Sequence, residues 1–197
     1  MIVLADNDVI HKLACCDLLP ELMLWLKAPP NQVLVLPGLR FVLRRKLKAD
    51  KVALECFENF LNKTQEIPQA PIALMERFGL LDVGERQMLA VLIDNKKVSQ
   101  MVTGDKRALK LIGDMHLADA DLSSRLSETR IDCLESIMLG LIEQFGFNAI
   151  NVKATRGLKA DGVLGMSFGG KRTQAHAEDA LRSYLDEVRA TAPFVES

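Results

Sequence analysis

Acidic side chains stand at three places in the chain where they could act together on a bound cation. Asp6 follows the apolar run Ile2 to Ala5, Glu85 follows Gly84 at the start of a helical pattern, and Asp105 follows a second apolar run. Three converging carboxylates repel one another unless a cation neutralises them, and oxygen ligands suit Mg²⁺ or Mn²⁺. A divalent ion held in this way polarises a phosphodiester and orients a water for attack, so no His, Ser or Cys nucleophile is needed.

Each of these acids also has a purely structural explanation. Asp105 can cap its helix, and a carboxylate such as Glu85 is favourable near the positive end of any helix dipole. The spacing from Asp82 to Glu85 matches a capping box, and we expect Asp8 to be the N-cap of the first helix. The functional interpretation therefore depends on all three acids meeting at the carboxyl ends of the strands, where open α/β sheets bind ligands.

Short apolar runs alternate with helical patterns along the first three quarters of the chain. The sequence predicts strands at 2–5, 33–36 and 99–103 and a strand or turn at 66–68, and it gives no assignment for 116–130. This alternation predicts an α/β fold, a three-layer α/β/α sandwich with a mainly parallel central sheet. Amphipathic patterns predict helices that begin near 8, 39, 50, 72, 85, 106 and 131, the last of them ending at 145.

The composition changes near Gly146. Residues 146–170 are rich in glycine, which predicts loop or irregular structure, and residues 173–190 form a convincing amphipathic helix. We therefore expect a core domain at 1–145 and a C-terminal helical extension at 146–197.

Composition excludes several classes of protein. The 197 residues are 49% hydrophobic and 26% charged, and the net charge of −1 provides no global attraction to nucleic acid or membrane. The four cysteines show no CxxC spacing, which argues against a zinc site or disulfide framework and favours a reducing cytoplasm. No apolar stretch approaches the roughly 20 residues that span a bilayer, so we expect a cytoplasmic protein without a membrane anchor.

Basic residues gather in two places that could contact nucleic acid. Residues 40–51 carry Arg44, Arg45 and Lys46 among other cations, and the alternatives are a solvated helix face and a surface that neutralises phosphates. Lys106 and Arg107 directly follow Asp105 and are better placed to meet a scissile phosphate.

Taken in order, the three acidic motifs resemble those of the PIN-domain family of metal-dependent nucleases. Asp6 to Ile10 is similar to the opening motif of the family, Leu81 to Arg86 to its central acidic motif, and Val102 to Arg107 to its T-x-D motif. The resemblance covers residues 1 to about 145 and implies a Rossmann-like sandwich that cleaves RNA with Mg²⁺ or Mn²⁺. It also implies that Asp6, Glu85 and Asp105 are the catalytic metal ligands, with Asn7, Asp8 and Thr103 as supporting residues.

The same resemblance implies partners. Many small members of the family are toxins neutralised by a separate antitoxin protein, and homodimers are common. The expected substrate is RNA, and the expected partners are an antitoxin and a second copy of the chain.

One motif of the family is missing here. The family usually has a further acid on the helix after the second strand, where this chain has Val42 or one of its neighbours, and Glu55 or Glu58 would have to substitute from the next helix. This departure leaves open a second hypothesis, a nuclease-derived module that binds nucleic acid with weakened catalysis.

A third hypothesis is a phosphatase of the haloacid-dehalogenase type. Asp6-Asn7-Asp8-Val9 also fits the DxDx motif of that family, in which the first Asp is a nucleophile that forms a phospho-aspartate. That family needs a later lysine followed by a pair of acids, and Lys171 comes after every acid that could serve. The order of residues therefore disfavours this hypothesis.

Overall fold

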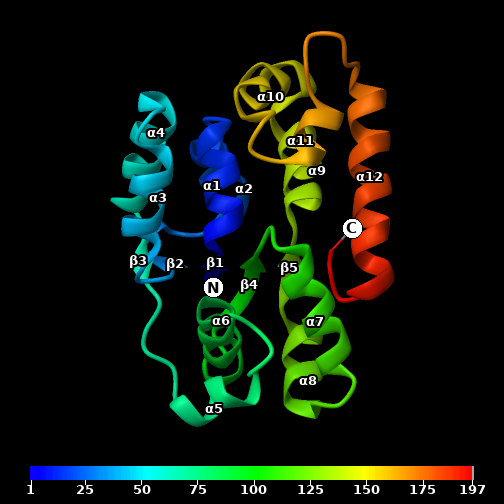
Figure 1. The fold of residues 1–197 in the computed structure, drawn as a ribbon. Helices are drawn as coiled ribbons and strands as arrows, with labels where there is room; N and C mark the ends of the chain where they lie inside the picture. Colours follow the sequence, from blue (N-terminus) through cyan, green and yellow to red (C-terminus); the bar gives the residue numbers. More distant parts are fainter. Residues whose placement is uncertain (197) are drawn as a thin grey trace.

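A five-stranded parallel sheet forms the centre of the molecule in the computed structural model, which describes residues 1–196 (Figure 1). The strand order is β3-β2-β1-β4-β5, so the first strand is central, and all neighbouring pairs are parallel. Ala5, the last residue of β1, pairs with Val35 on one side and Val102 on the other, which brings three strand ends level. The strands are β1 (Ile2–Ala5), β2 (Val33–Val35), β3 (Gln65–Glu66), β4 (Val98–Val102) and β5 (Arg130–Asp132).

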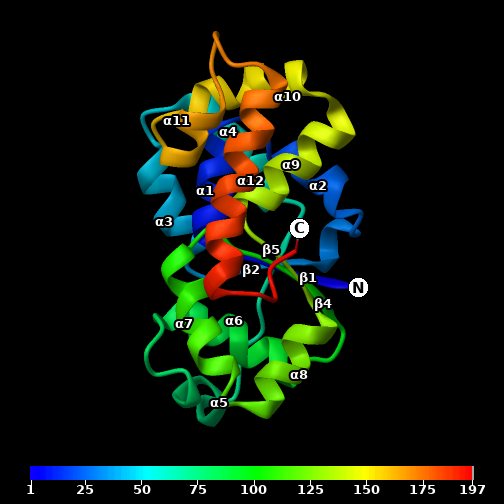
Figure 2. The ribbon, with the colours of Figure 1, turned by 90° about the vertical axis from the view of Figure 1, so that its right-hand side faces the viewer.

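Helices cover both faces of the sheet, which confirms the predicted three-layer α/β/α sandwich. Helices α5 to α8 lie on one face, α1 to α4 and α9 to α11 lie on the other, and α12 runs along the side past both layers (Figures 1 and 2). No helix among residues 1–196 combines the length and the apolar character that crossing a membrane requires. The helices are α1 (Asn7–Cys15), α2 (Leu19–Leu26), α3 (Leu39–Leu47), α4 (Lys51–Leu61), α5 (Ile72–Arg77), α6 (Val83–Asp94), α7 (Lys106–His116), α8 (Ala120–Glu128), α9 (Leu134–Phe145), α10 (Phe147–Ala154), α11 (Gly162–Ser167) and α12 (Gln174–Thr191), with 3₁₀ turns at Pro30–Gln32 and Thr155–Gly157.

The central strand explains why its sequence is continuously apolar. Successive side chains of a strand point to opposite faces, and a parallel sheet is covered on both. Val3 and Ala5 pack into the cluster beneath α1, α2 and α9, whereas Leu4 packs into the cluster beneath α6, α7 and α8. All three side chains are fully buried.

The expectation of irregular structure at 146–170 is wrong, because this segment forms α10 and α11. Gly157 in this segment serves close packing, because a Cβ there would lie 2.3 Å from Sγ of Cys16, the C-cap of α1. Phe147 and Leu164 join the same buried cluster as Leu13, so the C-terminal extension completes the core on this face. The division at residue 145 stays a prediction.

Two further expectations need correction, and one unassigned segment gains a helix. Residues 130–132 form the fifth strand, although the apolar pattern from Ile131 predicts helix, because a three-residue buried strand has no periodicity of its own. Helix α8 occupies the unassigned segment 116–130. The N-cap of α1 is Asp6, whose carboxylate accepts from the Asn7 amide, and Asp8 lies in the first turn instead.

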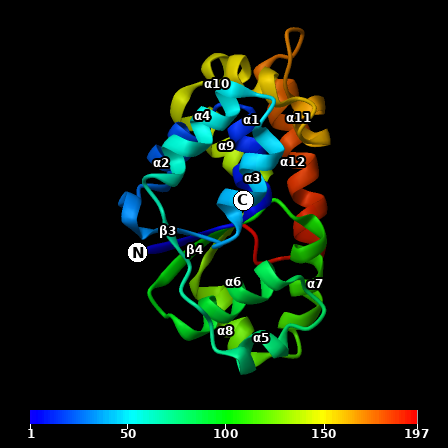
Figure 3. The same cartoon turned by 60° about the vertical axis from the view of Figure 1, so that its left-hand side comes forward.

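Helix α12 holds the two layers together from the side (Figure 3). Ala177 and Leu181 pack into the cluster on one face of the sheet, and Leu185 and Val188 pack into the cluster on the other. Beyond α12, the Glu196 amide donates to the Ile131 carbonyl at 2.8 Å, which protects the exposed edge of β5.

Replacing Gly113 by alanine tests the docking of the C-terminal segment against α7. A Cβ on Gly113 would lie 1.9 Å from the Thr191 carbonyl oxygen, so backbone must move, whereas nothing lies within 4 Å of a Cβ on Gly170. We expect Gly113→Ala to lower the free energy of unfolding by about 1–3 kcal/mol, as overpacking does. Urea unfolding measures this, with Gly170→Ala as the control. Equal unfolding midpoints for the two variants would contradict the packing described.

Candidate functional site

A cleft of about 490 Å³ opens at the carboxyl ends of β1 and β4, and we call it the acidic cleft. The structure brings the three predicted acids together there, although they are separated by up to about a hundred residues of chain. Its walls come from the β1–α1 junction, α3, the first turn of α6 and the loop before α7. It is lined by Asp6, Asn7, Asp8, Leu36, Val42, Lys46, Asp82, Val83, Gly84, Glu85 and Asp105.

Asp6 lies deepest among the acids of the cleft. Only 8% of the residue is exposed, because it sits at the end of the central strand. One carboxylate oxygen accepts from the Asn7 amide at 2.7 Å, and the other accepts from the Thr103 hydroxyl at 3.0 Å. These two bonds fix the carboxylate, as the supporting roles predicted for Asn7 and Thr103 require, except that Asn7 acts through its backbone.

The environment of Asp6 disfavours its negative charge. Burial raises the pKa of Asp6 to about 6 although the hydrogen bonds from Thr103 and Asn7 lower it, and the charges of Asp8 and Asp105 raise it further. A cation bound beside a buried carboxylate stabilises its ionised form, which burial otherwise disfavours. The negative charge of Asp6 is therefore the one in the cleft that a bound cation would stabilise most.

Glu85 reaches the cleft from the first turn of α6. Its carboxylate accepts from the Asp82 amide at 2.9 Å, and the Asp82 carboxylate accepts from the Glu85 amide at 2.9 Å, which confirms the predicted capping box. Burial raises the pKa of Glu85, although the hydrogen bond from the Asp82 amide lowers it. The charges of Asp82, Asp105 and Asp6 raise this pKa as well. The acid that caps the helix is thus electrostatically coupled to the other acids.

Asp105 combines a structural role with a place in the cleft. One oxygen of its carboxylate caps α7 by accepting from the amides of Arg107 and Ala108 at 2.8 and 3.0 Å. The Asp105 amide donates to the Thr103 hydroxyl oxygen at 3.3 Å, and that hydroxyl in turn donates to Asp6. Thr103 therefore links the two aspartates, and capping leaves the second oxygen of Asp105 available.

Asp8 differs from the other acids because a buried lysine neutralises it. Lys12 Nζ lies 2.5 Å from Asp8 and 2.8 Å from Asp161 of the C-terminal extension. Burial lowers the pKa of Lys12, but the hydrogen bonds from Lys12 to Asp161 and Asp8 outweigh it and raise the pKa above its ordinary value. This lysine was not predicted, and the only signal in the sequence is its i,i+4 spacing from Asp8.

Gly104 must be small for the acids to meet. A Cβ at this position would lie 2.5 Å from Asp8 Oδ2 and 3.3 Å from the Val9 amide. The loop that carries Asp105 therefore passes directly over the start of α1. The Lys12 ammonium also lies 3.4 Å from the Gly104 carbonyl oxygen and holds the loop in place.

Only one of the five predicted nucleic-acid-binding cations lines the cleft, and it is Lys46. Arg44 instead pairs with Glu58 through two contacts of 2.6 and 2.8 Å, and Lys106 pairs with the buried Glu135 at 2.7 Å. Arg45 and Arg107 are exposed outside the lining of the cleft.

Val42 of α3 lines the cleft where the resemblance leads us to expect a further acid. Neither candidate substitute reaches this place, since Glu58 is held by Arg44 and Glu55 is exposed on α4. The wall formed by α3 therefore offers a methyl surface and the Lys46 ammonium rather than a fourth carboxylate.

The oxygen atoms that line the cleft are of the kind that bind a hard divalent cation. Asp6, Glu85 and Asp105 provide carboxylate oxygens, and the side-chain oxygen of Asn7 is buried without a hydrogen-bond partner. As they stand, no three His, Cys, Asp or Glu side chains among residues 1–196 are already arranged as the ligands of a metal ion. A cation here would therefore draw the acids closer together or take part of its coordination from water, as Mg²⁺ usually does.

Substitution of Asp6 by asparagine tests the electrostatic description in metal-free buffer. Because the pKa of Asp6 is raised to about 6 in the folded state, the wild-type protein loses stability as the pH rises from about 4 to about 6. Asp6→Asn removes this loss, so at pH 7.5 we expect it to raise the free energy of unfolding by about 2–3 kcal/mol.

The same substitution should give no gain at pH 4, where Asp6 is protonated in the folded wild-type protein. Urea unfolding of both proteins at the two pH values, with a chelator present, measures the difference. A gain that is equal at both pH values would show that the carboxylate is not strained by its surroundings.

Comparison of the chain with protein-family models, with curated proteins and with solved structures gives no match. Membership of the PIN-domain family therefore stays a proposal that rests on the three acidic motifs. The functional argument has to be made from the geometry of the acidic cleft.

Proposed function

We propose that this protein is a metal-dependent endoribonuclease of the PIN type. The single observation that supports this most strongly is the convergence of Asp6, Glu85 and Asp105 on one cleft in which burial and mutual repulsion raise the pKa of Asp6. Acids placed at such cost at the carboxyl edge of a parallel sheet are typical of a functional site.

The proposal assigns a role to each residue of the cleft. Asp6, Glu85 and Asp105 would hold Mg²⁺ or Mn²⁺, which when bound polarises the phosphodiester and stabilises the leaving oxygen. Thr103 orients the Asp6 carboxylate through its 3.0 Å hydrogen bond. The Lys46 ammonium, on the opposite wall, is placed to attract the phosphates of an RNA strand.

Cytoplasmic location, a role as the toxin of a toxin–antitoxin pair, an antitoxin partner and a homodimer all follow from the sequence and its resemblance alone. They accompany the proposal as its expected biological setting. The phosphatase alternative has no support from the cleft, because Lys171 is not among its lining residues.

A second candidate function, RNA binding with weakened catalysis, is favoured by Val42. The cleft has one carboxylate fewer than the resemblance implies, and a set with less negative charge holds a divalent cation less tightly. The two functions differ in whether added metal produces cleavage.

Incubation of the protein with a single-stranded RNA and Mn²⁺ or Mg²⁺ tests the nuclease proposal. We expect endonucleolytic cleavage that a chelator abolishes and that Asp6→Asn or Asp105→Asn reduces at least a hundredfold, because each variant removes a ligand charge. Gel analysis of end-labelled RNA measures the rate.

The matched control is Asp114→Asn, since Asp114 is exposed in the same helix that Asp105 caps. This control should cleave at the wild-type rate. Equal rates for wild type, Asp6→Asn and Asp105→Asn would identify a contaminating nuclease and sink the proposal. Metal-independent binding of RNA without cleavage would favour the second function.

Introducing an acid at Val42 separates the two functions from the opposite direction. Because Val42 lines the cleft, Val42→Glu adds a carboxylate to the candidate ligands Asp6, Glu85 and Asp105, and we expect Mn²⁺ to bind about tenfold more tightly. Calorimetry of Mn²⁺ binding measures this, with Val52→Glu on the exposed surface of α4 as the control. If both variants bind Mn²⁺ as the wild-type protein does, then α3 does not face a cation site.

A further inference from the structure

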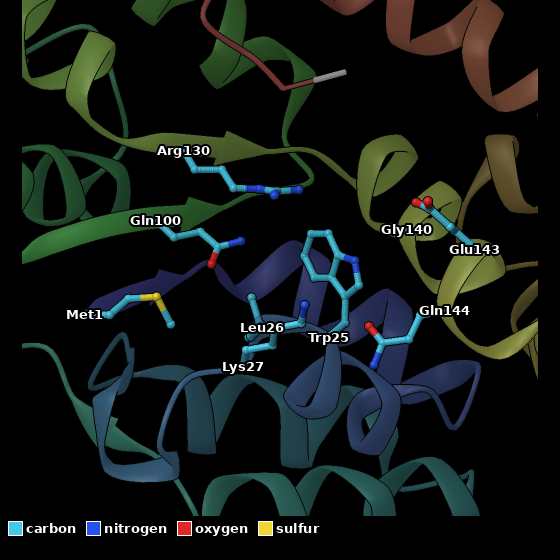
Figure 4. A pocket seen from close by; sticks show the side chains of 9 residues that line it. All are labelled: Met1, Trp25, Leu26, Lys27, Gln100, Arg130, Gly140, Glu143 and Gln144. Carbon is cyan, nitrogen blue, oxygen red and sulfur yellow. The ribbon is translucent and has the colours of Figure 1, made fainter.

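A second cavity, of about 720 Å³, lies away from the acidic cleft and shares no residue with it. It opens beside the amino ends of β1 and β5, beneath the end of α2 and the second half of α9 (Figure 4). Its volume is that of a cavity for a small organic ligand. We call it the Trp25 cavity, lined by Met1, Trp25, Leu26, Lys27, Gln100, Arg130, Gly140, Glu143 and Gln144.

The indole of Trp25 has a fixed position and remains partly exposed. Its edge packs on α9 at Gly140, where a Cβ would lie 2.3 Å from the indole nitrogen. The Arg130 guanidinium lies over the ring, 5.0 Å from its centroid. Trp25 also lines an adjacent cavity of about 460 Å³, as do Arg130 and Glu143.

Arg130 is held in place by a buried polar network at the back of the cavity. Asp132, which is fully buried, accepts from Arg130 at 2.8 and 3.0 Å, from Gln100 at 2.8 Å and from Ser136 at 3.2 Å. The guanidinium and the Gln100 amide are therefore preorganised, and their remaining polar atoms border the cavity. Ordering such groups before binding lowers the entropy cost of taking up a ligand.

The open side of the cavity carries a carboxylate, an amide and an ammonium group. Glu143, Gln144 and Lys27 are exposed residues that line the cavity. No ion pair joins Glu143 or Lys27 to another residue within 1–196. These groups therefore offer two acceptor oxygens, an amide and a positive charge to a ligand.

We propose that the Trp25 cavity binds a guanine nucleotide, with the base stacked on Trp25. Nucleobases stack on aromatic rings and on arginine planes, and the fixed indole with the Arg130 guanidinium over it combines both. The paired N–H donors of guanine match the Glu143 carboxylate, and its O6 and N7 acceptors match N–H groups of Gln144 or Arg130. The Lys27 ammonium matches the negative charge of a phosphate.

The same chemistry is provided by a free mononucleotide and by a guanine within single-stranded RNA. This inference does not rest on the proposed nuclease activity, because none of the residues that carry it lines the acidic cleft. Its test can therefore fail or succeed independently of RNA cleavage.

Trp25 is the only tryptophan in the chain, so tryptophan fluorescence reports on the surroundings of this one ring. Titration of the wild-type protein, without divalent metal, with guanosine monophosphate should quench the emission to a saturable end point. Adenosine monophosphate should bind at least about tenfold more weakly, because it lacks the paired donors that Glu143 accepts. Uridine monophosphate should bind more weakly still, since a single ring stacks over less of the indole.

Two variants distinguish the proposed contacts from general quenching. Glu143→Gln should weaken guanosine monophosphate binding about tenfold and leave adenosine monophosphate binding unchanged, whereas Glu55→Gln on exposed α4 should alter neither. Gly140→Ala should displace the indole of Trp25 and weaken the binding of both nucleotides. Thermal unfolding of each variant verifies that it is folded.

A single-stranded RNA oligonucleotide with one guanine forms the second arm of the experiment. Saturable quenching by the mononucleotide identifies a free nucleotide as the ligand, and quenching by the oligonucleotide alone identifies RNA. Absence of saturable quenching by either at millimolar concentration overturns the proposal, and equal affinity for guanosine and uridine monophosphates does so as well.

Discussion

Burial of the Asp6 carboxylate at the end of the central strand is the constraint on which the candidate site depends. Burial alone would cost several kcal/mol if the charge were left uncompensated. The amide of Asn7 and the hydroxyl of Thr103 offset part of this cost, but the nearby charges of Asp8 and Asp105 add to it. A bound cation would reduce both the free-energy cost of the buried charge and the repulsion between the carboxylates.

The parallel register of the sheet creates this situation. Because Ala5 pairs with Val102, the residues that follow β1 and β4 emerge side by side, and Thr103 can reach Asp6. The capping box then turns Glu85 toward the same place from α6. Asp6, Glu85 and Asp105 all take part in helix caps and also line the cleft, so local helix chemistry and the candidate function use the same side chains.

The first line of the sequence predicted much of the fold, because a four-residue apolar run followed by acids has few structural interpretations. Strand β1 could be predicted for this reason. Strands β2 and β4 could be predicted from similar short apolar runs, the parallel sheet from their alternation with helical patterns, and the capping box from the spacing of Asp82 and Glu85. Strand β5 could not, since Ile131 continues the helical apolar pattern that runs to Phe145, and only pairing with β4 makes it extended. The packing of Gly157 on Cys16 is likewise a tertiary contact, and its glycine suggested a loop.

The candidate site likewise has residues that the sequence predicts and residues that only the tertiary structure brings together. Asp6, Glu85 and Asp105 could be found because strand ends and helix starts are visible in the sequence. Lys12, which pairs with Asp8, could not be found, because it also pairs with Asp161, 149 positions further along the chain. Two of the predicted nucleic-acid-binding cations form ion pairs instead. Arg44 pairs with Glu58 and Lys106 pairs with Glu135, and the spacing of these residues in the sequence does not reveal either pair. Long-range ion pairs are set by topology rather than by local pattern.

A crystal structure of the protein with Mn²⁺, located by its anomalous scattering, tests the central claim most directly. The account predicts one ion in the acidic cleft, at a carboxylate–metal distance of about 2.0–2.3 Å from Asp6 and from at least one of Glu85 and Asp105. An acidic cleft without Mn²⁺ at saturating concentration, or an ion bound without Asp6, would contradict it.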